Sequence, residues 1–392
     1  MPNGTVIVGG SVAGVGVAIE LRRLGYEDAV TILEAQPTPP YDRPPLSKGV
    51  LTGTVDPADL AFHPEEQYTQ LGIDIRTSTR AVGLDDDQLA VRLTDGSKVA
   101  ADMIVIASGA RARPFPTDEL SGAVWTVRDL PDAIGLSSAL AKAERVVIIG
   151  GGFIGAEVAT SARALGCAVV LVEVGTLPFE PLLGIEVATR LARLHESGGT
   201  EVRCGVGVER VEQLAVGQRV HLADGSHVDA DVVVAGLGAV LNVEWLAGSG
   251  LVGDRGVRCD DRGHTMRSGV YAVGDVATWT NGDGVAVRHE HWTSAREQAR
   301  IVAHEIAAIE GPRWSDSVPY VWSDQYGKRI QVLGSPAGAD LVKVVDEDLG
   351  RGSFVALYAR AGRLIGVVGC NAAGRTMRYR SRLAAAATLD EL

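Results

Sequence analysis

Short apolar runs alternate with amphipathic segments through most of the chain. Residues 5–10, TVIVGG, form a β-branched run that ends on glycine, which predicts a buried strand. Residues 11–25 follow with apolar positions at helical spacing, and residues 29–34, AVTILE, form a second apolar run. The pattern therefore predicts a strand–helix–strand unit at the start of the chain.

The same pattern recurs about 140 residues later. Residues 145–166, RVVIIGGGFIGAEVATSARALG, predict a strand, a glycine turn and a helix, and residues 168–173, AVVLVE, predict the next strand. Each unit is followed by a predicted hairpin that leads into a strand, over residues 89–110 and 218–239. The chain thus contains an internal repeat at the level of a domain.

From about Val318 the pattern changes to successive short strands, followed by a predicted helix from Ala372 to about Ala387. We therefore expect an α/β protein with two Rossmann-like three-layer domains and a small α+β C-terminal domain. The expected boundaries are 1–112 for the first part of the first domain, 113–237 for the second domain, 238–316 for the second part of the first domain, and 317–392 for the C-terminal domain.

Composition narrows the class of protein. The 392 residues include 46% hydrophobic residues and 48 glycines, and the formal net charge is −12. This balance argues against nucleic acid or an anionic membrane as the main partner. The four cysteines are scattered, so disulfides, zinc sites and a redox dithiol are unsupported. No apolar run reaches the ~20 residues of a membrane span, and no signal-like segment precedes the first strand, so a cytoplasmic location is expected.

The second glycine loop has the sequence Gly150-x-Gly152-x-x-Gly155 between a predicted strand and helix. The first glycine permits the turn, the second lets the backbone approach a pyrophosphate, and the third lets the helix pack closely on the strand. Glu173 ends the following strand, where a carboxylate accepts a hydrogen bond from a ribose 2′-hydroxyl. A carboxylate there repels a 2′-phosphate, so NADH is favoured over NADPH.

The first glycine loop, Gly9-x-Ser11-x-x-Gly14, has serine at its middle position, and Glu34 provides the acid. Serine is small, so the close approach of a phosphate survives. A lone glycine loop also fits a purely packing role, but two loops with their acids favour dinucleotide binding. Residues 270–278, VYAVGDVAT, then fit either a capped turn or a carboxylate at Asp275 that meets the ribityl and pyrophosphate part of a flavin cofactor.

The order of these motifs resembles the two-dinucleotide-binding-domain flavoproteins of the glutathione-reductase-like superfamily. Residues 41–48, YDRPPLSK, are similar to the Arg-Pro-Pro-Leu-Ser-Lys segment of the FAD-dependent NADH:ferredoxin reductases, of rubredoxin or putidaredoxin type, that serve bacterial oxygenases. That segment stands where disulfide reductases carry a cysteine pair. Residues from Glu290, EHWTSAREQA, and from Tyr320, YVWSDQYGKRIQVLG, match the same family, so the resemblance covers nearly the whole chain.

The resemblance implies the role of the charged octapeptide. It places Lys48 near the hydride-accepting nitrogen of the flavin and pairs it with Glu157, and these two are the expected catalytic residues. A cation there stabilises the negative charge of reduced flavin, and Glu157 compensates that cation when the flavin is oxidised. Pro44 and Pro45 restrict the backbone, so the segment is preorganised. The alternatives are a solvated lysine for Lys48 and a surface salt bridge for Arg43.

The resemblance also implies that both Rossmann-like domains bind a dinucleotide, with FAD in the domain formed by residues 1–112 and 238–316 and NAD in the domain formed by residues 113–237. It further implies two sets of cofactor-binding residues. The FAD set is Gly9, Ser11, Ala13, Gly14, Glu34, Arg43, Pro44, Lys48, Ala81, Ala107, Ser108, Gly109, Arg113, Gly274, Asp275, Glu290, His291 and Trp292. The NAD set is Gly150, Gly152, Phe153, Ile154, Gly155, Glu157, Glu173, Gly236 and Gly238. Trp292 could instead be an ordinary packed tryptophan, Arg113 a surface charge, and Gly236 and Gly238 packing positions.

No metal site is expected. His289, Glu290 and His291 are adjacent and do not share one face, and no distant His or Cys set accompanies them. For a partner, Arg375, Arg378 and Arg382 fall at positions i, i+3 and i+7 of the predicted last helix. An acidic ferredoxin would dock on such a basic face, with Lys328 and Arg329 as an extension of it, although a solvated helix face fits equally.

The sequence therefore predicts an FAD-containing reductase that passes electrons from NADH to a small iron–sulfur protein, a ferredoxin that supplies an oxygenase. Catalysis is then mostly cofactor chemistry, with the protein orienting groups and tuning charge. Three alternatives remain open: a rubredoxin acceptor, an NADH oxidase or reductase of quinones or other small acceptors, and an apoptosis-inducing-factor-like flavoprotein that binds partners.

Overall fold

The structure is a computed structural model that describes residues 3–85, 88–116, 122–280, 284–348 and 350–389. Two compact units are each assembled from separate stretches of the chain. The first unit comprises Met1–Asp42, Ala61–Arg111 and Val240–Pro319, and the second comprises Arg43–Leu60, Ala112–Ala239 and Tyr320–Leu392. The strands β8 (Ala110–Ala112) and β17 (Ala239–Leu241) span boundaries between these stretches along the chain.

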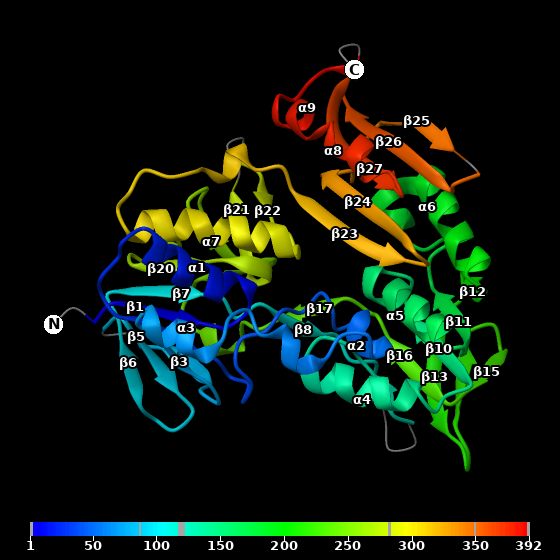
Figure 1. Cartoon of the computed structure of the whole chain (residues 1–392), viewed down its shortest axis with the longest axis horizontal. Helices are drawn as coiled ribbons and strands as arrows, with labels where there is room; N and C mark the ends of the chain where they lie inside the picture. The colour runs from blue at the N-terminus through cyan, green and yellow to red at the C-terminus, as the bar shows by residue number, and fades with distance from the viewer. Residues whose placement is uncertain (1–2, 86–87, 117–121, 281–283, 349, 390–392) are drawn as a thin grey trace. The chain divides into compact units, whose positions relative to one another are not determined.

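The first unit is built on a parallel sheet whose described strands run in the order β20-β7-β1-β2-β3 (Figure 1). These strands are β1 (Thr5–Val8), β2 (Val30–Leu33), β3 (Ile73–Arg76), β7 (Met103–Ile106) and β20 (Val270–Ala272). All four residues of β1 and of β2 are buried. Burial on both faces explains why these strands are continuous apolar runs without alternation.

Helices α1 (Val12–Arg23) and α7 (Trp292–Ile306) of the first unit pack against each other. The buried residues of α1 recur at the spacing of one helix face, as at Val17 and Leu21. The remaining elements of this unit are α3 (Glu65–Gln70), β4 (Ala81–Leu84), β5 (Ala90–Leu93), β6 (Lys98–Ala100), β18 (Val252–Gly253), β19 (Gly256–Cys259), β21 (Ala277–Thr280), β22 (Ala286–Val287), and the 3₁₀ turns η2 (Glu244–Leu246), η3 (Gly274–Val276) and η4 (Trp314–Asp316).

The second unit repeats this architecture with a parallel sheet in the order β12-β11-β10-β16-β9. The strands are β9 (Val124–Trp125), β10 (Arg145–Ile149), β11 (Ala168–Glu173), β12 (Thr200–Cys204) and β16 (Val232–Ala235), and the helices are α4 (Leu130–Leu140), α5 (Phe153–Ala164) and α6 (Glu180–Ser197). An antiparallel sheet adds β13 (Val208–Gln213), β14 (Gln218–Leu222) and β15 (His227–Ala230). The expected pair of Rossmann-like sheets is confirmed.

Residues 43–60 belong to the second unit although they precede its other stretches by more than fifty positions in the chain. They contain the short helix α2 (Gly49–Thr52) and the 3₁₀ turn η1 (Pro57–Leu60). Helix α2 packs against α4 and α5, and the Ser137 hydroxyl donates a 3.1 Å hydrogen bond to the Leu51 carbonyl oxygen. The octapeptide YDRPPLSK is thereby divided between the two units after Asp42.

The C-terminal stretch forms an antiparallel sheet in the order β23-β24-β27-β26-β25 (Figure 1). Its strands are β23 (Tyr320–Gln325), β24 (Lys328–Gly334), β25 (Leu341–Asp348), β26 (Ser353–Arg360) and β27 (Arg363–Cys370). Side chains of this sheet, including Ile330 and Tyr358, share one apolar core with buried residues of α6 such as Leu183 and Leu191. The sheet therefore packs against α6 of the second unit.

The prediction of one helix over residues 372–387 is wrong. Two short helices, α8 (Ala373–Met377) and α9 (Arg380–Ala384), occupy this stretch. Beyond α9 the chain returns to the sheet, where the Leu364 amide donates to the Ala387 carbonyl oxygen at 2.9 Å. The helical run is interrupted at Arg378 and Tyr379, so Arg375 and Arg382 belong to different helices and the three arginines do not share the face of one helix.

Among the described residues, no helix combines the length and the apolar character needed to cross a membrane.

Candidate functional site: two glycine loops and a lysine–glutamate pair

The first glycine loop connects β1 to α1 in a conformation that requires glycine. Gly9 has a φ of +116°, and a Cβ atom there would lie 2.2 Å from the Ala107 carbonyl oxygen. A Cβ atom on Gly14 would lie 1.9 Å from the Gly9 carbonyl oxygen. Ser11 is the N-cap residue of α1 and has an extended backbone. The first turn of α1 thus begins directly at the loop, as anion binding at a helix N-terminus requires.

The second glycine loop repeats this geometry between β10 and α5. Gly150 has a φ of +99°, and a Cβ atom on Gly155 would lie 2.1 Å from the Gly150 carbonyl oxygen. A Cβ atom on Gly152, in contrast, would have no described atom within 4 Å. Gly150 and Gly155 are therefore needed for the fold of the loop, whereas Gly152 keeps the space above the loop open for a ligand.

Both predicted ribose acids also bind their own loops, which the sequence does not indicate. Glu34 Oε2 accepts from the Gly10 amide at 2.8 Å, and Oε1 accepts from the Gln36 amide at 2.8 Å. Glu173 Oε2 accepts from the Gly151 amide at 2.7 Å, and Oε1 accepts from the Gly175 amide at 2.7 Å. Each carboxylate is held at the end of its strand and retains lone pairs for a further donor.

The turn at Gly274 lies beside the first loop. A Cβ atom on Gly274 would be 3.1 Å from the Ala13 Cβ atom, and the Gly274 amide donates a 2.7 Å hydrogen bond to Gln298 Oε1 of α7. Asp275 follows in η3. The structure therefore brings the predicted residues Ala13, Gly274 and Asp275 together, and Gln298 is a positioning residue that sequence reasoning missed.

The predicted residues Ala107, Ser108 and Gly109 follow β7 and pass the first loop. Ser108 forms two hydrogen bonds with Asn242, one from its hydroxyl to the Asn242 carbonyl oxygen and one from Asn242 Nδ2 to the Ser108 carbonyl oxygen, both at 2.8 Å. Ala81 begins β4 of the same unit. Ala107 and Ser108 therefore lie where the turn after β7 approaches the first glycine loop.

Residues Glu290, His291 and Trp292 lead into α7 of the first unit. Burial lowers the pKa of His291 to about 4, and burial together with the neighbouring His291 lowers the pKa of His289 to about 4. Both imidazoles are thus neutral at pH 7. No group of three or more potential metal ligands occurs among the described residues.

Trp292 is held by two neighbours of the first unit. Its indole Nε1 donates a 2.8 Å hydrogen bond to Asp42 Oδ1, and the Arg296 guanidinium lies 4.9 Å from the ring centroid. A guanidinium over an indole face is a cation–π contact. Asp42, the second residue of YDRPPLSK, therefore orients this tryptophan, a contact that joins residues 250 positions apart.

The second unit contains the predicted Lys48–Glu157 pair. Lys48 Nζ lies 2.8 Å from Glu157 Oε2 and donates a further 3.1 Å hydrogen bond to the Pro44 carbonyl oxygen. Glu157 is buried, at 3% exposure, on α5. A buried carboxylate needs partners to offset its desolvation, and the ammonium of Lys48 is one of them.

Two serines complete the surroundings of the Glu157 carboxylate. The Ser47 hydroxyl donates to Oε2 at 2.5 Å, and the Ser323 hydroxyl of β23 donates to Oε1 at 2.7 Å. Both serines are buried. Sequence reasoning missed them because each partner lies more than 100 positions from Glu157 in the chain, although Ser47 precedes Lys48 in the octapeptide that carries the resemblance.

Three other predicted residues have partners within the second unit. Arg43 forms an ion pair with Asp129 and donates a 2.6 Å hydrogen bond to the Arg128 carbonyl oxygen. The Arg113 amide donates to the Gly238 carbonyl oxygen at 2.9 Å. A Cβ atom on Gly236 would lie 3.2 Å from the Gly155 backbone. Gly236 therefore belongs to the close packing around the second loop, and Arg43 anchors its segment to the start of α4.

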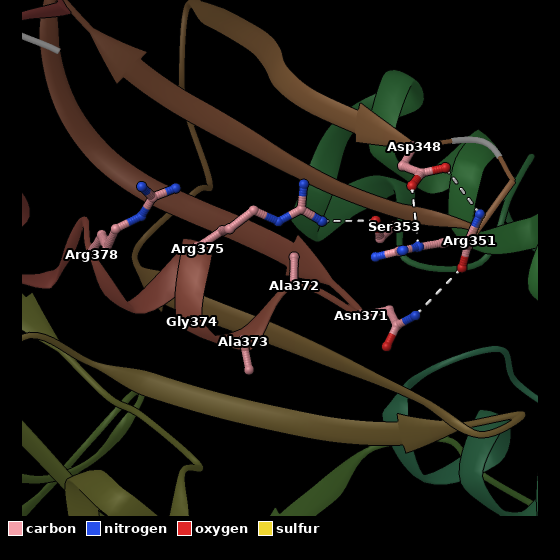
Figure 2. Close-up of a pocket in the computed structure, with 9 residues that line it drawn as sticks. All are labelled: Asp348, Arg351, Ser353, Asn371, Ala372, Ala373, Gly374, Arg375 and Arg378. Carbon is pink, nitrogen blue, oxygen red and sulfur yellow. Dashed lines mark hydrogen bonds and ion pairs between the residues drawn. The ribbon is translucent and has the colours of Figure 1, made fainter.

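Charged side chains gather at a pocket of about 790 Å³ on the C-terminal sheet (Figure 2). Arg375 forms an ion pair with Asp346 and donates to Ser353 Oγ at 2.7 Å, and Arg351 Nε lies 3.6 Å from Asp348. Arg378 lines the same pocket without an ion pair to any described residue. Of the other predicted docking residues, Arg329 pairs with Asp324, and Lys328 donates to the Arg351 carbonyl oxygen at 2.7 Å.

Two family profiles match this chain. The profile described as pyridine nucleotide-disulphide oxidoreductase matches residues 4–299, and the profile described as reductase C-terminal matches residues 320–391. The second profile begins at the first strand of the C-terminal sheet.

Characterised proteins with similar sequences include the ferredoxin reductase component of chlorobenzene dioxygenase from Cupriavidus sp. (strain PS12). It is 36% identical over 375 residues, which cover 95% of this chain and 90% of that protein. Rhodocoxin reductase from Rhodococcus erythropolis is 34% identical over 385 residues, which cover 97% of this chain and 89% of that protein.

Solved structures with the same fold include the ferredoxin reductase of the CYP199A2 system from Rhodopseudomonas palustris. It has a TM-score of 0.93 and 31% identity, and the match covers 98% of this chain and 95% of that chain. The covalent complex of putidaredoxin reductase with putidaredoxin matches with a TM-score of 0.91 and 29% identity, over 98% of this chain and 93% of that chain.

Proposed function

This chain belongs to the pyridine nucleotide-disulphide oxidoreductase family, and we propose that it is an FAD-containing reductase that passes electrons from NADH to a small iron–sulfur protein. The predicted kinship with ferredoxin reductases of bacterial oxygenase systems is confirmed by relatives that are components of such systems. The α/β fold with two dinucleotide-binding domains and the oxidoreductase class are confirmed as well.

The Lys48–Glu157 pair in a chain without a paired cysteine carries the proposal. Lys48 Nζ lies 2.8 Å from a buried carboxylate, whereas Cys167, Cys204, Cys259 and Cys370 are all free thiols in separate parts of the chain. A family member that uses a dithiol needs two neighbouring cysteines. Without them, the electrons leave for an acceptor outside the chain, and a fixed cation assists the redox group directly.

The first unit fits FAD. A side chain cannot be accommodated at Gly9 or Gly14, so the backbone at the start of α1 is not covered by side chains at these two positions, and Glu34 follows the next strand. We assign the pyrophosphate to this loop, the adenosine ribose to Glu34, and the ribityl side to Gly274 and Asp275. When bound, FAD supplies two-electron acceptance from a nicotinamide and one-electron delivery to an acceptor, chemistry that no side chain provides.

The second unit fits NADH. The open space at Gly152 receives the pyrophosphate, and the Glu173 carboxylate keeps acceptor capacity for a ribose 2′-hydroxyl. A 2′-phosphate would bring like charge against this carboxylate. We therefore propose NADH as the electron donor, with Phe153 and Ile154 at the first turn of α5 beside the nucleotide.

In this function Lys48 holds a positive charge and Glu157 balances it. The ammonium stabilises negative charge that develops on the cofactor during reduction, and the buried carboxylate offsets the ammonium before reduction. Lys48 therefore acts through charge alone, and no residue of the chain has to serve as a nucleophile or a general acid. Trp292, oriented by Asp42, is proposed to line the flavin side of the first unit.

The proposed acceptor is an acidic ferredoxin, with a rubredoxin as the alternative within the same mechanism. At the pocket of the C-terminal sheet, Asp346 and Asp348 offset the charges of Arg375 and Arg351, and Arg378 adds a guanidinium without an ion pair to any described residue, in a chain with a net charge of −12. A local positive surface on an acidic protein attracts an acidic partner and sets its association rate. We propose this pocket as part of the docking surface.

An anaerobic titration of the purified protein with NADH and with NADPH tests the proposal, with the visible flavin band as the readout. We expect bleaching by NADH at far lower concentration than by NADPH, followed by reoxidation on addition of a ferredoxin. A yellow protein that neither nucleotide reduces would contradict the reductase mechanism and favour a binding flavoprotein. Reduction followed by reoxidation with oxygen or quinones alone would favour an oxidase or a small-acceptor reductase.

A cytoplasmic location is part of the proposal, because free thiols persist in a reducing compartment and because NADH is the expected donor. Fractionation of the source cells with an antibody to the chain tests it. Recovery in the membrane or the periplasmic fraction would contradict this location.

A further inference from the structure

The Glu157 carboxylate is the meeting point of three segments of the second unit. Its three described hydrogen-bond donors are Ser47 Oγ, Lys48 Nζ and Ser323 Oγ, at 2.5, 2.8 and 2.7 Å. A carboxylate provides two acceptor oxygens and no donor when ionised, so all three contacts suit an ionised glutamate. The donors come from the segment after Asp42 and from β23 of the C-terminal sheet.

We propose that Ser47 and Ser323 are positioning residues that hold the Glu157 carboxylate in one orientation and thereby fix the place of the Lys48 ammonium. The inference rests on the proposed function for the role of Lys48. The two serines themselves do not touch the cofactor or the substrate in this proposal, since both are buried and both donate to Glu157.

The two serine hydroxyl groups donate to different oxygens of the Glu157 carboxylate, and together they define a single orientation of its plane. Ser47 shares Oε2 with Lys48, and Ser323 alone occupies Oε1. The terminal torsion of a glutamate is soft and does not hold the plane of the carboxylate by itself. With a donor on each oxygen, rotation of the carboxylate breaks at least one charge-assisted hydrogen bond.

Ser323 is itself locked by a second contact. Gln325 Nε2 donates a 3.1 Å hydrogen bond to Ser323 Oγ, so the hydroxyl proton of Ser323 is directed to Glu157. Ser47 is locked from the backbone side, because the Ser161 hydroxyl of α5 donates to the Ser47 carbonyl oxygen at 2.8 Å. Both serines are therefore oriented by contacts that do not involve Lys48.

Lys48 needs this arrangement because its own stem is flexible. The ammonium group stands at the end of four methylene groups, and unlike the planar guanidinium of arginine it has no fixed hydrogen-bonding direction. The ammonium has two described anchors, Glu157 Oε2 and the Pro44 carbonyl oxygen. If the carboxylate rotates, the stronger anchor moves, and the charge of Lys48 is no longer held where reduction of the cofactor requires it.

Ser323→Ala and Ser47→Ala test the proposal, with Ser137→Ala as the matched control. Ser137 donates to the backbone of the same 43–60 segment, at Leu51, but does not contact Glu157. The first readout is independent of the cofactor: the rate at which an amine-acylating reagent labels Lys48, measured by peptide mass spectrometry. We expect labelling about tenfold faster in Ser323→Ala, the factor typical for loss of a hydrogen bond to a charged group, and unchanged in Ser137→Ala.

The second readout separates positioning from loss of stability. In Ser323→Ala we expect a lower midpoint potential of the bound flavin. The rate of flavin reduction by NADH should fall about tenfold, whereas the Kd for NADH should change less than about twofold. In a Lys48→Met background the same serine change should leave the potential unaltered, because the two residues act as one unit. Additive effects of Ser323→Ala and Lys48→Met on the potential would overturn the proposal.

The outcomes remain distinguishable from failure of the proposed function. If NADH does not reduce the unaltered protein, the reductase function fails while the labelling experiment still decides the inference. If NADH reduces the unaltered protein but Ser323→Ala and Ser47→Ala behave like Ser137→Ala in labelling and potential, the positioning role is overturned. Should Ser323→Ala not fold, Ser47→Ala decides alone.

Discussion

Lys48 Nζ lies 2.8 Å from Glu157 Oε2, although 109 positions separate the two residues in the chain. The lysine belongs to a proline-rich segment, and the glutamate belongs to the helix that follows the second glycine loop. Their contact links the two features that most strongly favour a reductase, the thiol-free octapeptide and the second glycine loop.

Replacement of Lys48 by methionine should slow flavin reduction by NADH about 10²-fold, the loss typical for removal of one preorganised electrostatic group. The change removes the charge and keeps most of the apolar stem. Stopped-flow absorbance at saturating NADH measures the rate, and the Kd for NADH should stay within a factor of about two because ground-state binding does not use the ammonium.

Lys98→Met is the control for this substitution, since Lys98 also forms an ion pair, with Asp85, but lies in the first unit. NADH should reduce the flavin of Lys98→Met at the same rate as the flavin of the unaltered protein. Equal rates for Lys48→Met and the unaltered protein would remove Lys48 from the mechanism.

Substitution of the two strand-end acids should separate the two cofactors. Glu173→Gln keeps the shape but removes the charge that braces Gly151 and Gly175, and it should weaken NADH binding about tenfold and reduce the preference over NADPH. Glu34→Gln should instead weaken retention of FAD. Nucleotide titration and the flavin content after gel filtration measure the two effects, and a loss of flavin in Glu173→Gln would contradict the assignment.

Two glycines of the second loop should respond in opposite ways. Gly155→Ala forces a Cβ atom to 2.1 Å from the Gly150 carbonyl oxygen and should lower the melting temperature. Gly152→Ala meets no described atom within 4 Å and has a φ of −73°, so the fold should tolerate it while the new methyl group occupies the space for the pyrophosphate. Thermal melts and NADH titration of both variants check this; tight NADH binding by Gly152→Ala would place the pyrophosphate elsewhere.

The second unit should lose stability in mild acid because of His195. This side chain is fully buried on α6, its Nδ1 lies 2.9 Å from the Tyr326 hydroxyl, and burial lowers its pKa from 6.5 to about 4. As the pH falls, His195 is protonated in the unfolded chain before it is protonated in the folded protein. The contribution of neutral His195 to the free energy of unfolding is therefore complete above pH 6.5 and is lost as the pH falls toward 4. At a pH of about 4 the loss amounts to about 3 kcal/mol.

His195→Gln should therefore make the free energy of unfolding less dependent on pH between about 6.5 and 4 than in the unaltered protein. The pKa values of His289 and His291 are also lowered, so these two residues keep part of the pH dependence in both the variant and the unaltered protein. Urea titrations at several pH values measure it. An unchanged slope in the variant would show that His195 titrates equally in the folded and unfolded chains.

Reversal of charge at Arg378 should weaken the reaction with an acidic ferredoxin. Arg378→Glu is expected to raise the KM for ferredoxin about fivefold and to flatten its dependence on salt, with flavin reduction by NADH unaltered. Lys142→Glu, another exposed cation of the second unit, provides the control. If both variants behave alike, net charge and not the pocket in Figure 2 governs the encounter.

The sequence by itself determined the elements that depend on local spacing. The buried runs at 5–8 and 146–149 became parallel strands, and Gly9, Gly14, Gly150 and Gly155 lie in turns that a Cβ atom would obstruct. These features are readable because strand burial, helix spacing and the steric needs of a tight turn are set by residues close together in the chain. The family resemblance added the pairing of Lys48 with Glu157.

Only the tertiary structure decided contacts whose partners lie far apart in the chain. It assigned Ser47 and Ser323 to Glu157, Asp42 to Trp292, and Arg43 to Asp129. It also divided the octapeptide after Asp42, and it ended the last helix at Ala384, because the chain beyond it hydrogen-bonds back to the sheet at Leu364 although its alanines and arginines have high intrinsic helix propensity. Burial and donor–acceptor geometry decide which of these residues meet. Neither leaves a periodic pattern in the sequence from which the contact could be predicted.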